Sequence, residues 1–312
     1  MNAGGAPPAC KRDPTNEDVR VEYIEARRVL LDALEALKDQ LDAVVLVGAQ
    51  AVYLRTTNRL PTYQPFTTDA DIVLDPNRLS DRPALGAAMR GAGLVLTSEP
   101  GIWEARFKRA GFEEEIVVPV DLIVPMHIAS GAGRRSARLG ADHGKSTARK
   151  SEGLEGVLVE HSTIEIRAVD RADNRTVTVN VAGEAALVIA KLHKLGDRLD
   201  KPARLDAKDA GDVYRLFDVV ASDDLAIRFR MLLADPRSTN ATEKALVFGD
   251  RLFGGATSVG TRLGIEALRA VVPEATASAV LTTYWRILRE TLAGSVHCRR
   301  RAGTRRSHRI QR

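Results

Sequence analysis

The sequence predicts a mixed α/β fold in which a sheet with helices is followed by an all-helical C-terminal region. Short apolar runs bounded by glycine and proline recur between residues 43 and 181, as is typical of strands. Apolar residues at helical spacing precede the first run and fill nearly everything after Gly183. At 312 residues, with 44% hydrophobic and 28% charged residues, the chain has room for one large domain or two ordinary ones.

The first half predicts alternating elements. Residues 1–16 are rich in Gly, Ala and Pro and are expected to form a disordered tail. Thr15 or Asn16 is expected to cap a helix over 19–41, before a buried strand at 43–47 and a short helix at 49–57. The spacing then predicts strands at 67–75, 94–96, 103–108, 113–124, 156–159, 164–169 and 177–181, a helix at 79–91, and a mobile loop at 129–152.

The second half predicts only helices. These are expected at 183–199, 205–220, 223–234, 241–253, 260–271 and 273–293. We therefore divide the chain into a tail (1–16), a sheet-containing domain (17–182), a helical domain (183–295) and a basic tail (296–312).

Charge is unevenly placed along the chain. The net charge is +5, yet residues 298–312 hold seven arginines and no acid, so the rest is slightly acidic. A second basic stretch spans 131–150. Such clusters are typical of phosphate-backbone contact, although a solubilising surface explains them as well.

The remaining composition favours a cytoplasmic protein. No apolar run approaches the roughly 18 residues needed to span a bilayer, and the N-terminus lacks the apolar segment of a secretory signal. Cys10 and Cys298 stand far apart, which fits a reducing compartment and no disulfide framework. We expect no membrane partner.

Asp69 and Asp71 are the first candidate site residues. On a strand, residues two apart point to the same face, so these carboxylates repel each other. A divalent cation removes that repulsion, and hard oxygen ligands suit Mg²⁺. The alternative is a solvated strand edge with two surface acids.

Gly48 and Asp121 are the second pair of candidates. Gly48 follows a buried strand and opens a helix, so a phosphate can approach the free N–H groups there. Asp121 is a carboxylate between apolar strand residues and needs a partner, which a metal can supply. The alternatives are an ordinary turn and an edge-strand acid paired with an arginine.

These motifs together resemble a known superfamily. Val47-Gly48-Ala49, Asp69-Ala70-Asp71 and Val120-Asp121-Leu122 resemble the DNA polymerase β-like nucleotidyltransferases. Downstream, the stretch from Glu184 to Lys191, Arg198, and the stretch from Lys208 to Val213 resemble the AbiEii-type (MenT-like) nucleotidyltransferase toxins. The resemblance covers roughly residues 40–220 and implies a nucleotidyltransferase-fold mixed sheet. The chain departs from that pattern at Ala49, which has no hydroxyl, and at Lys208, where the family has arginine.

The resemblance also implies roles for the acids. Asp69 and Asp71 would bridge two Mg²⁺ ions, while Asp121 would hold one metal and accept the proton of the attacking hydroxyl. Asp209 would orient Lys191 or act as an alternative base; its alternative is a surface ion pair with Arg204 or Lys208.

The cations and the turn would hold the nucleoside triphosphate (NTP). Lys191 and Lys194 lie three residues apart on one helix face and could neutralise the phosphates, although a surface stripe of lysines is the alternative. The expected nucleotide contacts are Gly48, Ala49, Thr68, Lys191 and Lys194.

The function that the resemblance implies is Mg²⁺-dependent transfer of a nucleoside monophosphate from an NTP to RNA. The tRNA 3′ end is the expected acceptor, and the protein would act as the toxin of a bacterial toxin–antitoxin system, with an antitoxin protein as partner. One alternative is transfer to a small molecule such as an aminoglycoside, against which the +5 charge argues mildly. The other is a non-catalytic module that binds RNA or protein.

Overall fold

A computed structural model describes residues 16–56, 66–109, 112–130 and 135–304. The expected N-terminal tail therefore lies almost entirely outside the described residues. So do the end of the basic tail and the first part of the basic stretch at 131–150.

One mixed sheet organises the first half of the chain, in the order β3-β4-β5-β2-β1-β8-β7. The strand β6 pairs with residues 123–125 of β5, past the residues that pair with β4. β2 is antiparallel to β1 and parallel to β5, while β8 is parallel to β1. Their buried Val, Ile and Leu residues explain the near-continuous apolar runs. The strands are β1 (Val44–Val47), β2 (Ala70–Leu74), β3 (Val95–Leu96), β4 (Ile102–Phe107), β5 (Ile116–Pro125), β6 (Arg149–Ser151), β7 (His161–Arg167) and β8 (Thr176–Ala182).

Helices in the first half support this sheet. α1 (Asn16–Ala36) packs against β2, β5 and β8, and a 3₁₀ turn, η1 (Lys38–Ala43), continues toward β1. α2 (Gly48–Arg55) follows β1 directly. α3 (Leu85–Gly91) is shorter than the predicted helix at 79–91, because Pro83 disfavours helical backbone at the residue before it.

Two sequence predictions in this half are wrong. The segment 129–152, predicted to be a loop, contains η2 (Ala141–His143) and β6, and it buries Ala137 and Ala148. Of the residues 156–159 predicted to be a strand, 156–158 instead belong to η3 (Glu155–Leu158), a short 3₁₀ helix, and Val159 follows it in a turn. An apolar run this short does not distinguish a strand from a buried helical turn.

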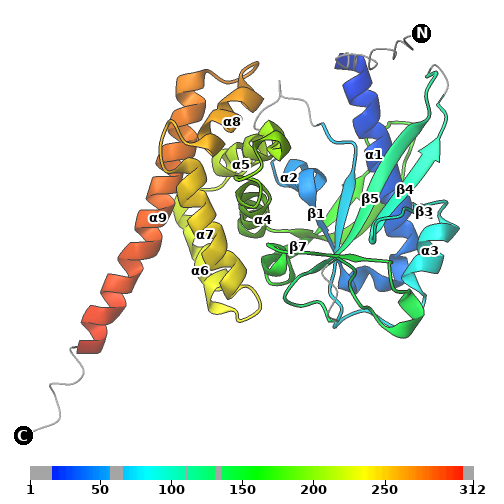
Figure 1. Cartoon of the computed structure of the whole chain (residues 1–312), viewed down its shortest axis with the longest axis horizontal. Helices are drawn as coiled ribbons and strands as arrows, with labels where there is room; N and C mark the ends of the chain where they lie inside the picture. Colours follow the sequence, from blue (N-terminus) through cyan, green and yellow to red (C-terminus); the bar gives the residue numbers. More distant parts are fainter. Residues whose placement is uncertain (1–15, 57–65, 110–111, 131–134, 305–312) are drawn as a thin grey trace, which may run out of the picture.

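The second half is helical, as predicted. A short 3₁₀ turn, η4 (Pro202–Arg204), separates the first two helices, and Asp206 caps α5 by accepting the Lys208 N–H. Figure 1 shows this half on the left of the molecule, with α4 and α5 nearest the sheet. The helices are α4 (Glu184–Gly196), α5 (Ala207–Val219), α6 (Ser222–Ala234), α7 (Thr239–Phe253), α8 (Val259–Leu268) and α9 (Glu274–Thr304).

The two halves contact each other through α2, which packs on both α4 and α5. The ends of β1 and β2 therefore lie close to two helices that are distant in sequence. Within the described ranges, no helix combines the length and apolar character needed to cross a bilayer.

Candidate active site

Two of the three predicted acids lie directly opposite each other. Asp71 on β2 pairs in register with Asp121 on the parallel strand β5, so both side chains emerge on the same face. Asp69 lies just before β2 rather than within the predicted strand, and its carbonyl oxygen accepts a hydrogen bond from the Gln50 side chain at 3.0 Å. The negative charges of Asp69 and Asp121 both act on Asp71.

Burial and this crowding change the ionisation of Asp71. Burial, followed by the charges of Asp69 and Asp121, raises the pKa of Asp71 to about 6, although Lys194 and Arg149 act in the opposite direction. Lys194 and Arg149 thus do not outweigh the combined effect of burial and the two neighbouring carboxylates. Such an unbalanced carboxylate cluster is a physical reason to expect a bound cation.

The predicted glycine turn touches this cluster. Gly48 has φ of +71°, a conformation that L-residues rarely adopt, and a Cβ placed there would lie 2.1 Å from Asp71 Oδ2. The residue before it, Val47, pairs in register with Asp71. Ala49 is buried and offers no side-chain donor, while Thr68 is exposed beside Asp69.

A buried ion network lies across from the acids. Lys191 Nζ lies 2.7 Å from Asp209 Oδ1 and 2.6 Å from Asp212 Oδ2, and only 5% of Lys191 is exposed. Burial alone would lower the pKa of Lys191, but the charges of Asp212 and Asp209 outweigh it and raise the pKa. Lys191 therefore stays charged and is no surface lysine.

Asp209 holds this network together. Burial would raise its pKa, but Lys191 and then Lys194 lower it below the usual range, so Asp209 remains ionised and is a weak base. Lys194 Nζ lies 3.1 Å from the same carboxylate and is half exposed. The contact with Lys191 is the orienting contact that the sequence suggested, and the structure records no ion pair from Asp209 to Arg204 or Lys208.

A second link from α5 reaches the acids. Lys208 Nζ donates to Thr67 Oγ1 at 3.1 Å, and the Thr67 hydroxyl donates to Asp69. Lys208 is half-buried and lies next to Asp209 in sequence. The first turn of α5 thus contacts both the acid cluster and the lysine network.

Several of these groups line one cavity of about 270 Å³. Four of the predicted site residues line it, namely Gly48, Asp71, Lys191 and Lys194. The other predicted residues do not line it: Asp69, Asp121, Ala49, Thr68 and Asp209. Besides Gly48, the lining includes the polar or charged side chains of Asp71, Arg149, Ser151, Glu152, Lys191, Lys194, Asp197 and Arg198.

Arg149 belongs to the site although the sequence patterns did not single it out. Its guanidinium Nη2 lies 2.5 Å from Asp121 Oδ2, so the acid–arginine pair left open above is formed, although β5 is not an edge strand. The basic stretch contained the signal, but Arg149 could not be assigned while its segment was predicted to be a loop. Arg198, quoted above only for the resemblance, also lines the cavity and lies 3.8 Å from Asp209 Oδ2.

Comparisons with known proteins show little. No family model matches the chain, and no curated protein matches it. The crystal structure of JHP933 from Helicobacter pylori is similar over 93% of this chain and 100% of that chain, with 14% identity and a TM-score of 0.43. A second H. pylori structure, provisionally named a nucleotidyltransferase, is similar over 90% and 98%, with 12% identity and a TM-score of 0.31. At such low scores, neither likeness assigns an activity to this chain.

Proposed function

We propose that this protein is a metal-dependent nucleotidyltransferase that moves a nucleoside monophosphate from an NTP to RNA. The observation that carries the proposal is the in-register pairing of Asp71 with Asp121, beside Asp69 and against Gly48. A cavity lined by Asp71 on one side and by Lys191 and Lys194 on another suits a triphosphate with bound cations.

The residues present fit a divalent metal. Asp69, Asp71 and Asp121 offer hard oxygen donors, and the pKa of Asp71 is raised by burial and then by the charges of Asp69 and Asp121, which supports a cation at this cluster. These three residues would hold Mg²⁺, which supplies charge neutralisation at the phosphates and activation of the attacking hydroxyl.

The cations of the cavity would bind the phosphates. Lys194 is half exposed and Arg198 lies nearby, so both can exchange their contacts with Asp209 for phosphate oxygens. Lys191 already has two carboxylate partners, so its role in the proposal is to fix the charge and position of α4 beside the cavity.

The chemistry would be a single displacement. The acceptor hydroxyl oxygen attacks the α-phosphorus, the bond to the β-phosphate oxygen breaks, and pyrophosphate leaves. Asp121 would accept the hydroxyl proton, for which it must release Arg149.

RNA is the proposed acceptor because exposed basic side chains precede Arg149 in sequence, and Arg149 lines the cavity. Arg135, Arg138 and Lys145 are exposed in the segment that precedes β6, and Arg149 at the start of β6 lines the cavity. The tRNA 3′ end as acceptor, the toxin role and an antitoxin partner rest on the sequence resemblance alone.

The decisive experiment incubates the protein with total RNA, Mg²⁺ and each α-labelled NTP in turn. Wild type should label RNA, and Asp69→Asn, Asp71→Asn and Asp121→Asn should each reduce labelling by about a thousandfold. Asp75→Asn is the matched control, because Asp75 follows the other end of β2 and should leave labelling unchanged.

Other outcomes separate the alternatives. Undiminished labelling by Asp71→Asn would remove the assignment. Labelling of an aminoglycoside but not of RNA would move the protein to the small-molecule class. Tight Mg²⁺-independent RNA binding without NTP consumption would indicate a binding module. Growth arrest on induced expression of wild type, but not of Asp71→Asn, is the result expected of a toxin.

A further inference from the structure

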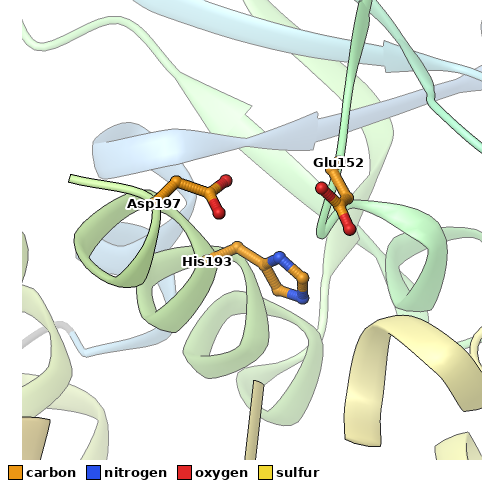
Figure 2. A group of neighbouring side chains, drawn as sticks. All are labelled: Glu152, His193 and Asp197. Atoms are coloured by element: carbon orange, nitrogen blue, oxygen red, sulfur yellow. The ribbon is translucent and has the colours of Figure 1, made fainter. Parts of the chain in front are cut away.

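A second cluster of potential metal ligands lies on another wall of the cavity. Figure 2 shows Glu152, which follows β6, facing His193 and Asp197. The last two lie four residues apart at the end of α4 and so share one face of that helix. One ligand atom from each of the three residues lies within 4.8 Å of the others.

The imidazole of His193 is buried and only half satisfied. It is 1% exposed, and its Nε2 lies 2.8 Å from the Ala241 carbonyl oxygen, so Nε2 carries the proton and donates it. Nδ1 is then unprotonated and presents a lone pair, and it has no hydrogen-bond partner among the described residues. A carbonyl that holds one imidazole nitrogen while the other stays free is the arrangement found behind metal-bound histidines.

The packing fixes this ring toward the acids. Gly153 has φ of +85°, and a Cβ there would lie 2.4 Å from His193 Cγ. Phe248 packs edge-to-face on the ring, with centroids 5.5 Å apart. The ring therefore has little freedom to turn Nδ1 toward another partner.

A lysine now compensates the acids. Lys244 Nζ lies 2.8 and 2.9 Å from the two carboxylate oxygens of Glu152 and 3.6 Å from Asp197 Oδ1. Partial burial would raise the pKa of Glu152, but the Lys244 contacts lower it, so the carboxylate is ionised and ready to coordinate. The Lys244 side chain is 40% exposed and can move into solvent when another cation arrives.

We propose that Glu152, His193 Nδ1 and Asp197 bind one divalent transition-metal ion, such as Zn²⁺, in exchange for Lys244. One nitrogen and two carboxylate oxygens form a donor set that zinc accepts, with the fourth position left open. Tetrahedral bonds of about 2.1 Å place ligand atoms about 3.4 Å apart, a contraction that the partly exposed Glu152 and Asp197 can provide. Both acids line the cavity, so the open position faces it.

This site differs in kind from the three aspartates. The nitrogen donor favours Zn²⁺ over Mg²⁺, which prefers oxygen ligands. Its existence does not depend on the proposed transfer reaction, and its test needs no turnover.

The test measures Zn²⁺ binding by calorimetry on the metal-stripped full chain, with Co²⁺ as a visible-absorption probe of the ligand set. The Asp69→Asn/Asp71→Asn background removes binding at the acid cluster. One equivalent should bind, and Glu152→Gln, Asp197→Asn and His193→Gln should each weaken binding by at least about tenfold. His193→Gln retains a donor for the Ala241 carbonyl while removing Nδ1 as a ligand.

Two further variants sharpen the result. His161→Gln is the control, because His161 also bonds a backbone carbonyl but lies outside the cluster, and it should bind Zn²⁺ as the background does. Lys244→Gln should bind Zn²⁺ more tightly, since the competing ammonium is gone. Unchanged affinity in Glu152→Gln and Asp197→Asn, or no binding at millimolar Zn²⁺, overturns the proposal even if His193→Gln does not fold.

Discussion

The acid cluster and the buried lysine network both contain closely spaced charged groups, but like charges meet in the first and opposite charges meet in the second. Around Lys191, each charge faces an opposite charge within 3 Å, and the network is almost completely buried. Around Asp71, carboxylates face carboxylates, and the pKa of Asp71 rises to about 6. The first arrangement balances its charges within the protein, so losing one partner is costly, whereas the second lacks that balance and favours a bound cation.

Breaking the lysine network should have the largest effect on stability. Lys191→Met leaves Asp209 and Asp212 buried without their main partner, so the free energy of unfolding should fall by about 3–5 kcal/mol. Urea denaturation measures the change. Lys194→Met is the control, because Lys194 is half exposed and its loss should cost less than about 1 kcal/mol. Equal losses would mean that burial does not distinguish the two lysines.

Gly48→Ala tests the turn that touches the acid cluster. Two costs combine: a positive φ and a Cβ that collides with the Asp71 carboxylate, so stability should fall by about 2 kcal/mol and transfer should be lost. Gly93→Ala isolates the backbone cost, because Gly93 also has a positive φ, of +81°, but nothing lies within 4 Å of its added Cβ. That control should lose about 1 kcal/mol and keep its transfer activity.

Asp71→Asn should stabilise the metal-free protein, in contrast to Lys191→Met. Because the folded-state pKa is raised to about 6, ionised Asp71 destabilises the folded chain above that pH, and the cost disappears as the pH falls toward the unfolded value. The variant should therefore be more stable than wild type by about 1 kcal/mol at a pH of about 7.5, and equally stable below a pH of about 4.

Thermal unfolding across this pH range measures that difference. Millimolar Mg²⁺ should raise the melting temperature of wild type near neutral pH but have less effect on Asp71→Asn. A variant that is less stable than wild type at neutral pH would contradict the view that the carboxylates repel one another.

Arg149→Gln should have the smallest effect. The guanidinium is about one-third exposed, so losing its pair with Asp121 should cost less than about 1 kcal/mol. The loss of positive charge should raise the pKa of Asp71, so the acidic limb of the transfer rate should move to higher pH. Arg138→Gln, which changes an exposed arginine in the same segment, should leave that limb in place.

The length of an element decided whether the sequence could predict it. Long-range periodicity predicted every α-helix of the second half, because each helix buries a continuous apolar stripe. Periodicity did not predict two short elements correctly. The strand β6 consists of three polar residues and so gives no apolar signal, and residues 156–159 form an apolar run that fits a strand and a helical turn equally well. The mixed α/β class followed from the longer elements and is confirmed.

At the candidate site, the aspartates could be singled out because their spacing is local. Asp71 and Asp121 stand next to each other through strand register, which the motif order suggested but periodicity alone could not fix. Arg149 and Lys244 were out of reach, because each meets its acid only through tertiary packing across 28 and 92 residues of sequence.

The first turn of α5 has a mechanical consequence. Lys208 donates to Thr67, which bonds Asp69, and the next residue, Asp209, pairs with Lys191, so adjacent side chains of one turn contact both the acid cluster and a lysine that lines the cavity. A displacement of this turn would break both contacts at once. A substitution that displaces this turn should therefore disrupt both contacts cooperatively. Each molecule should then be either fully assembled or inactive, rather than partly active.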